Sequence, residues 1–121
     1  MQFRDNKPIY LQIAEYMGDK ILSAQWQPDQ KIPSIRETAV ALQVNPNTVQ
    51  RTYEFLENKH IIYTKRGLGY FVSLDGVEQV QLYRKEQFFE EDLPLIFKNM
   101  QVLGIDTDEF IQRFETWKLS L

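Results

Sequence analysis

The sequence predicts a mainly α-helical protein with one small β-hairpin, divided into an N-terminal domain and a short C-terminal region of two helices. Apolar residues recur at helical spacing over most of the 121 residues. Two runs of β-branched and aromatic residues, 61–64 and 70–72, flank a loop that contains two glycines, a pattern typical of a hairpin. Residues 1–74 carry nine Lys and Arg against seven Asp and Glu, whereas residues 75–121 carry five against ten. We therefore expect two parts with different roles, residues 1–74 and residues 75–121.

The composition argues against several kinds of site. With 43% hydrophobic and 13% aromatic residues, the chain can bury one core. It has no cysteine and a single histidine, His60, so neither a disulfide nor a zinc site is expected, and we predict no cofactor. No apolar run approaches the ~20 residues of a membrane span, and the N-terminal residues lack the pattern of a signal peptide. These observations predict a cytoplasmic protein without a membrane partner.

The first predicted helix begins at Pro8, whose missing N–H would be unpaired at a helix start in any case. The polar stretch 27–30, which contains Pro28, predicts a turn after this helix. One apolar stripe at helical spacing is expected to be buried: Tyr10, Ile13, Ala14, Met17 and Ile21.

Two short helices follow, separated by a tight turn. Ser34 and Glu37 have the capping-box pattern at the start of the first of these two helices. This helix should end near Gln43. Asn45 is then predicted to be the N-cap of the next helix and Pro46 its first residue. Their inward stripes are Ile35, Ala39 and Leu42 in one helix and Val49, Tyr53 and Leu56 in the other. Two helices of about ten residues joined by such a turn predict a helix-turn-helix.

The polar residues near the turn and the hairpin are candidates for binding an anion. The outward-facing start of the second of these helices carries Asn47, Thr48, Gln50 and Arg51. The hairpin loop, 65–69, is basic at its tip. Although the net charge is −3, residues 31–70 contain six basic and three acidic residues, so the local field favours an anionic partner.

The C-terminal region is predicted to form two helices with an apolar packing seam. Pro94 should remove one hydrogen bond and bend the first helix, Gly104 should end it, and Asp106 should cap the second. The seam consists of Leu82, Phe89, Leu93, Ile96, Met100 and Leu103, followed by Phe110, Phe114 and Trp117. This region is too small to enclose its own aromatic surface, so we expect the seam to pair with a second copy of the chain. Packing against the N-terminal domain is the alternative.

Four motifs in order resemble the winged-helix DNA-binding domain of the GntR family of bacterial transcription regulators. They are PIYLQI at 8–13, KIPSIRE at 31–37, VNPNTV at 44–49 and RGLGYFV at 66–72. The resemblance covers about residues 8–73. The Asn-Pro-Asn-Thr variant and the short C-terminal region are most similar to the YtrA-like subfamily, which the resemblance associates with two dimerisation helices and no ligand-binding domain.

The resemblance implies a DNA-binding surface formed by the starts of the two short helices and the tip of the wing. The matching positions are Ser34, Arg36, Asn45, Pro46, Asn47, Thr48, Gln50, Arg51, Lys65, Arg66 and Gly67. Pro46 and Gln50 stand where many relatives have arginine, so the resemblance implies base recognition mainly by amide and hydroxyl groups, with adenine a suitable partner for Asn47 or Gln50. Gln43 and Asp29 each replace a common glycine, which leaves the backbone geometry there open.

Taken together, these features predict a sequence-specific DNA-binding transcription regulator, a repressor acting as a homodimer on a two-fold symmetric operator. A winged-helix module that binds protein instead of DNA is the alternative. An enzyme is not expected, because Glu90, Glu91 and Asp92 would fan around a helix axis as a solvated face. The sequence identifies no small-molecule effector.

Overall fold

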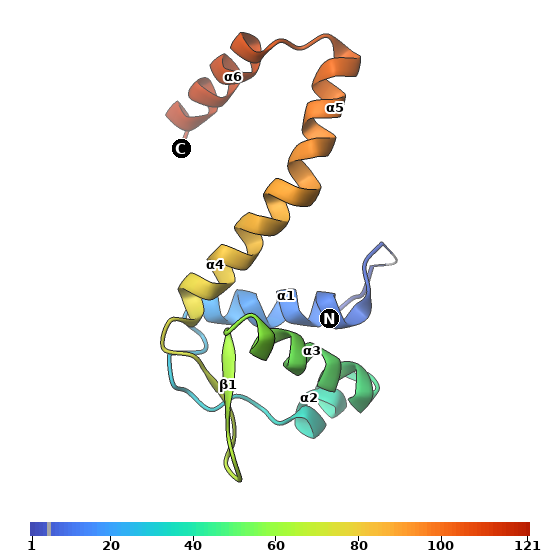
Figure 1. Ribbon diagram of the computed structural model, residues 1–121, viewed down its shortest axis with the longest axis vertical. Coiled ribbons are helices and arrows are strands. Elements are labelled where there is room, and N and C mark those ends of the chain that lie inside the picture. The colour runs from blue at the N-terminus through green and yellow to red at the C-terminus, as the bar shows by residue number, and fades with distance from the viewer. Residues whose placement is uncertain (5) are drawn as a thin grey trace. The chain divides into compact units, whose positions relative to one another are not determined.

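The computed structural model describes residues 1–4 and 6–121, which form two compact units, Met1–Tyr83 and Arg84–Leu121. The first unit contains α1 (Ile9–Leu22), α2 (Ile35–Leu42) and α3 (Pro46–Asn58), followed by an antiparallel hairpin of β1 (Ile62–Lys65) and β2 (Gly69–Val72). α4 (Gly76–Gln87) begins in this unit and continues into the second. The predicted fold class, mainly helical with a small hairpin, is confirmed (Figure 1).

The core of the first unit is built around α3, which contacts α1, α2 and β1. Val49, Tyr53 and Leu56 of α3 are buried, as their spacing predicted. The other buried apolar residues come from α1, α2, α4, the hairpin and the segments beside them: Ile13, Ala14, Met17, Ile21, Ile32, Ala39, Ile61, Ile62, Val72 and Val80. Tyr10 of the predicted α1 stripe is only half-buried.

The predicted helix starts are confirmed in α2 and α3. Ser34 and Glu37 form both hydrogen bonds of the capping box, and Asn45 caps α3 with Pro46 as its first residue. α1 begins one residue later than expected, because Pro8 has an extended backbone (φ −55°, ψ 141°) and is the N-cap. Its carbonyl still accepts the first N–H groups of the helix.

Four non-glycine residues among those described have positive φ, and two of them, Gln43 and Asp29, are the positions where relatives commonly have glycine. Gln43 ends α2 with φ 56°, and Asp29 has φ 64°. At Gln43 the backbone closes the helix: the N–H of Gln43 donates to Val40 and the N–H of Val44 donates to Ala39. Gln43 and Asp29 therefore keep the turn geometry although neither is a glycine, at a cost in backbone strain.

The hairpin is extended by the segment before α2. β1 and β2 pair in the register Tyr63 with Phe71 and Lys65 with Gly69. Lys31 forms a bridge with Phe71, and the N–H of Ile32 donates to the carbonyl of Tyr70 at 3.0 Å. The sequence did not predict this third segment, which anchors the hairpin to the helical part of the first unit.

The second unit consists of the end of α4, a π-helical turn η1 (Phe88–Asp92), α5 (Leu93–Leu103) and α6 (Thr107–Leu119). Gly104 ends α5 with φ 69°, and the Asp106 carboxylate caps α6 by accepting the N–H of Glu109, as predicted. The N–H of Leu93 donates to Phe88, five residues earlier. The ring of Pro94 would clash with the carbonyl four residues before it, and the wider π turn spans that position.

Among the described residues, no helix is long and apolar enough to cross a membrane.

Candidate nucleic-acid interface

Buried polar contacts fix the orientation of α3 between α1 and α2. The Tyr53 hydroxyl donates to the carbonyl of Pro33 and lies 2.9 Å from Oγ1 of Thr38. The phenol has one hydrogen, so Thr38 must be the donor in the second bond. Burial raises the pKa of Tyr53 to about 12. On the other side of α3, the Thr52 hydroxyl donates to the carbonyl of Tyr10 at 2.8 Å.

The first two turns of α3 present polar side chains to solvent. Oδ1 of Asn45 accepts the N–H of Asn47 at 2.8 Å. The side chain of Asn47 is exposed and has no hydrogen-bond partner among the described residues. Thr48 is half-buried, whereas Gln50 is exposed and donates to Glu54 at 3.2 Å. An exposed amide offers one acceptor and two donors, the pattern that matches the major-groove edge of adenine.

The start of α2 presents a cation beside the capping box. Oγ of Ser34 accepts the N–H of Glu37 at 3.0 Å, and the Glu37 carboxylate accepts the N–H of Ser34 at 3.0 Å. The backbone bond from Ser34, helped by its hydroxyl, holds the pKa of Glu37 below its usual value. Arg36 is exposed, and the described part of the chain offers its guanidinium no partner. This guanidinium can therefore bind a phosphate.

Arg51 is exposed but turned toward α1. Its guanidinium carbon lies 3.9 Å from the centre of the Tyr10 ring. Gln50 and Arg51, predicted together as one exposed turn, therefore differ, since Gln50 lies along α3 and Arg51 lies on the start of α1.

The tip of the hairpin is a tight basic turn. The N–H of Leu68 donates to the carbonyl of Lys65 at 2.9 Å, and Gly67 has φ 79°, as the third residue of a type II turn requires. Arg66 is exposed at the second position. Nζ of Lys65 lies 4.9 Å from the centre of the Phe71 ring. The turn is therefore stiff and carries two cations.

Aromatic stacking supports the outer face of the hairpin. The rings of Tyr63 and Phe71 stack with centroids 5.6 Å apart. The Tyr63 hydroxyl donates to Asp29 at 2.7 Å, and this bond raises the pKa of Tyr63. Gly69 has φ 120°, and a Cβ there would lie 3.1 Å from Cε of Lys31, so the lysine passes over the hairpin where no side chain obstructs it.

Sequence reasoning did not include Lys31, Phe71 or Tyr10 among the candidate residues. Each makes its contact with a residue at least 30 positions away, such as Phe71 with Lys31 or Tyr10 with Arg51. Lys31 and Tyr10 stand inside two of the quoted motifs, KIPSIRE and PIYLQI. Membership of those motifs was the signal that could have marked them.

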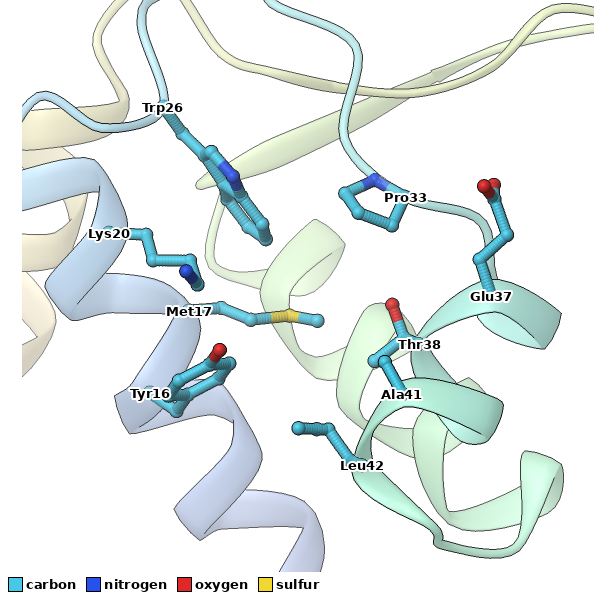
Figure 2. Close-up of a pocket in the computed structure, with 9 residues that line it drawn as sticks. All are labelled: Tyr16, Met17, Lys20, Trp26, Pro33, Glu37, Thr38, Ala41 and Leu42. Carbon is cyan, nitrogen blue, oxygen red and sulfur yellow. The ribbon is translucent and has the colours of Figure 1, made fainter. Parts of the chain in front are cut away.

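A small groove lies between α1 and α2, and Glu37, the capping-box partner of Ser34, is part of its lining (Figure 2). Lys20 lies between Tyr16 and Trp26, with Nζ 5.0 and 5.8 Å from the ring centres. Its lining residues are Tyr16, Met17, Lys20, Trp26, Pro33, Glu37, Thr38, Ala41 and Leu42. The volume of about 200 Å³ is below the ~300–1,000 Å³ typical of small-molecule sites.

All the residues predicted to bind DNA lie in the first unit, at the start of α2, the start of α3 or the tip of the hairpin. All are exposed except the half-buried Thr48. In Figure 1 the hairpin projects beyond the helices of this unit. The arrangement offers amides for base edges and cations for phosphates, but contact with DNA by each individual side chain stays a prediction.

The chain is similar to bacterial transcription regulators over nearly its full length. It is 37% identical to the HTH-type transcriptional regulator YhcF of Bacillus subtilis (strain 168), covering 96% of this chain and 94% of that protein. It is 32% identical to the HTH-type transcriptional repressor YtrA of the same organism, covering 88% and 81%. A GntR-family regulator from Bacteroides thetaiotaomicron has a similar structure, with a TM-score of 0.81 and 39% identity over 93% of this chain and 97% of that one.

Relatives of the first unit have been solved with DNA. The DNA-binding domain of AraR in complex with the operator ORX1 matches 60% of this chain and 93% of its own length, with a TM-score of 0.56 and 27% identity. The family model for bacterial regulatory proteins of the gntR family matches residues 9–72, which include the helix-turn-helix and the hairpin. The chain thus belongs to the GntR family of transcription regulators and is YtrA-like, with its DNA-binding winged helix in the first unit.

Proposed function

We propose that this protein is a homodimeric repressor that binds a two-fold symmetric operator. In each protomer α3 enters the major groove, the hairpin tip contacts the adjacent minor groove, and Arg36 binds a phosphate. The two half-sites are spaced by about one helical turn, ~34 Å, or a multiple of it. The proposal contains no catalytic step, since the relatives are named as transcriptional regulators.

The observation that carries the proposal is the exposed polar face of the first two turns of α3. Asn47 and Gln50 are exposed there on a helix whose orientation is fixed by the buried hydroxyls of Tyr53 and Thr52. Side chains on a rigid helix can match base edges without a large loss of conformational entropy on binding. The AraR domain, which resembles this unit, was solved on an operator, and this supports DNA as the partner.

The exposed apolar surface of the second unit supports the homodimer. Among its described residues, 84–121, no side chain is buried, and Leu103 and Trp117 are 70% and 57% exposed. Apolar surface of this extent is unusual on a monomer and marks an association site. In a two-fold dimer each copy covers the same patch of the other. A second copy of the chain is therefore enough to cover the seam.

The sign of regulation is inferred from relatives. YtrA, which matches most of this chain, is named a transcriptional repressor. As a repressor, the dimer would act by occupying its operator.

Selection of bound fragments from a random DNA library would test the proposal. The expected motif is two-fold symmetric, and on it Asn47→Ala should weaken binding by about fivefold to 150-fold for each half-site, because each lost bidentate base contact costs about 1–3 kcal/mol. With roughly 6–10 phosphate contacts per dimer, log K should fall against log salt with a slope of about −5 to −9. Arg66→Ala should reduce that slope, while Arg113→Ala in α6 provides a charge-matched control. Equal affinity for scrambled DNA, or a partner protein in place of DNA, would contradict the proposal.

A further inference from the structure

We propose that Tyr10 of α1 is a positioning residue for DNA binding, which holds the guanidinium of Arg51 flat so that its edge faces a DNA phosphate. This inference rests on the proposed function and assigns Arg51 to the phosphate backbone instead of a base. Tyr10 itself would touch no DNA. Its role is to fix a cation of the neighbouring helix in advance of binding.

The contact between the two side chains is close. Cζ of Arg51 is 3.9 Å from the centre of the Tyr10 ring, the distance expected of a stacked guanidinium. The lysine–ring contacts of the described residues are all longer, from 4.9 Å for Lys65 over Phe71 to 5.9 Å. Among the described cation–ring contacts, that of Arg51 is the shortest, and its guanidinium is a planar group that can stack on a ring.

α3 contacts Tyr10 at its backbone and at its ring. The Tyr10 carbonyl accepts the hydroxyl of Thr52, a fully buried residue next to Arg51. The ring also meets Phe55 edge to face, with centroids 6.1 Å apart and planes at 77°. Arg51 and Phe55 are four residues apart and so lie on the same side of α3. The Tyr10 ring is therefore fixed relative to the helix that carries Arg51.

Phe55 is supported in turn by a residue in the second half of α4. Its ring meets Tyr83 of α4 edge to face, with centroids 5.2 Å apart, and Lys59 lies near both rings. The stack Arg51, Tyr10, Phe55 and Tyr83 is thus a continuous set of ring contacts within the first unit. This support leaves the Tyr10 ring little freedom to turn away from Arg51.

Stacking uses the face of the guanidinium and leaves its edge free. The five N–H donors lie in the plane of the group, where they can form a bidentate bond with a phosphate. No carboxylate of the described residues pairs with Arg51, since the nearby Glu54 accepts from Gln50. An arginine loses rotamer freedom when it binds, and the stack removes much of that freedom beforehand. The Arg51 side chain also packs against α1, whereas the side chains of Asn47 and Gln50 are exposed on α3, which leaves them available for base contacts.

Four variants test the proposal, with fluorescence anisotropy on the selected operator and on a random duplex at several salt concentrations. Tyr10→Phe keeps the ring and should bind within about twofold of wild type. Tyr10→Leu should lose about threefold per protomer, or about tenfold for a dimer, equally on both duplexes. Arg51→Lys keeps the charge without the planar stack and should show a similar loss. Arg51→Ala should lower the salt slope by about one per protomer.

The double variant decides whether Tyr10 acts through Arg51. In the Arg51→Ala background, Tyr10→Leu should cause no further loss, because the residue that it positions is gone. A further loss of the same size, or an equal loss for Tyr10→Phe, would overturn the proposal, as would a loss confined to the operator. If thermal melting shows that the Tyr10→Leu variant is unfolded, the Arg51→Lys variant tests the proposal instead. Arg51 is exposed, and an Arg51→Lys variant that binds DNA with wild-type affinity would overturn the proposal. Absence of DNA binding by the wild type would instead refute the proposed function.

Discussion

At the scale of single residues, Tyr53 shows how one polar atom can set the geometry of an interface. Its position in the inward stripe of α3 was predicted from spacing and is confirmed by its complete burial. The partners of its hydroxyl, Pro33 and Thr38, are 20 and 15 residues away in the sequence. They could not be predicted, because periodicity identifies the buried face of a helix but not which atoms meet across the core.

Tyr53→Phe should destabilise the protein by about 1–3 kcal/mol at pH 7, because the Pro33 carbonyl loses its donor and the buried Thr38 loses its acceptor. The pKa of Tyr53 is raised to about 12 from 10.0, so the folded state favours the neutral phenol. The contribution of the neutral Tyr53 phenol to the free energy of unfolding is fully present below pH 10 and is lost as the pH rises from 10 through 12. Urea unfolding at fixed protein concentration should show the wild type losing its advantage over the variant in that window.

Tyr16→Phe is a matched control for the phenylalanine substitution. Tyr16 is half-buried at the rim of the groove between α1 and α2, and its hydroxyl has no hydrogen bond within the described residues. It should change the unfolding free energy by less than about 0.5 kcal/mol. A Tyr53→Phe variant as stable as this control would contradict the assigned role of the hydroxyl.

At the scale of elements, the helix ends were the most predictable features and the π turn the least. Ser34, Asn45 and Asp106 each have a side chain that caps the backbone locally, so the sequence is enough to identify them. The π turn η1 adds residues to one turn without altering which residues are apolar. The spacing of the seam therefore gave no sign of it, although Pro94 marked the place.

The end of α2 offers an element-scale prediction. Gln43 has φ 56°, in the region that costs a side chain about 1–2 kcal/mol, and its side chain is exposed. Gln43→Gly should stabilise the protein by about 0.5–1 kcal/mol after the added entropy of the unfolded chain is subtracted. The urea midpoint should rise without a change in slope. Gln43→Ala keeps a Cβ and should give no gain, and an equal gain from both would contradict relief of backbone strain.

At the scale of the whole molecule, the fold class and the family could be predicted because four local motifs occur in the right order. The unequal charge of the two parts was also visible in the sequence. How the second unit is covered could not be established in the same way, because one chain contains no information on contacts with another copy. The exposed apolar side chains of α5 and α6 identify the surface that a second copy would cover.

Leu103→Glu should convert the proposed homodimer into a monomer. Leu103 is 70% exposed on α5, and burying a carboxylate in an apolar contact of the ~1,200–2,000 Å² needed for a stable dimer carries a large desolvation cost. Gln101→Glu adds the same charge to an exposed polar position of the same helix and should leave the dimer intact. Sedimentation at micromolar concentration separates the two outcomes.

Because the dimer joins two half-site contacts, Leu103→Glu should also weaken operator binding by about 10²–10⁴-fold. The wild-type melting temperature should rise with protein concentration. A Leu103→Glu protein that stays dimeric, or a monomeric one that binds the operator at full strength, would show that the apolar surface of this region has another purpose.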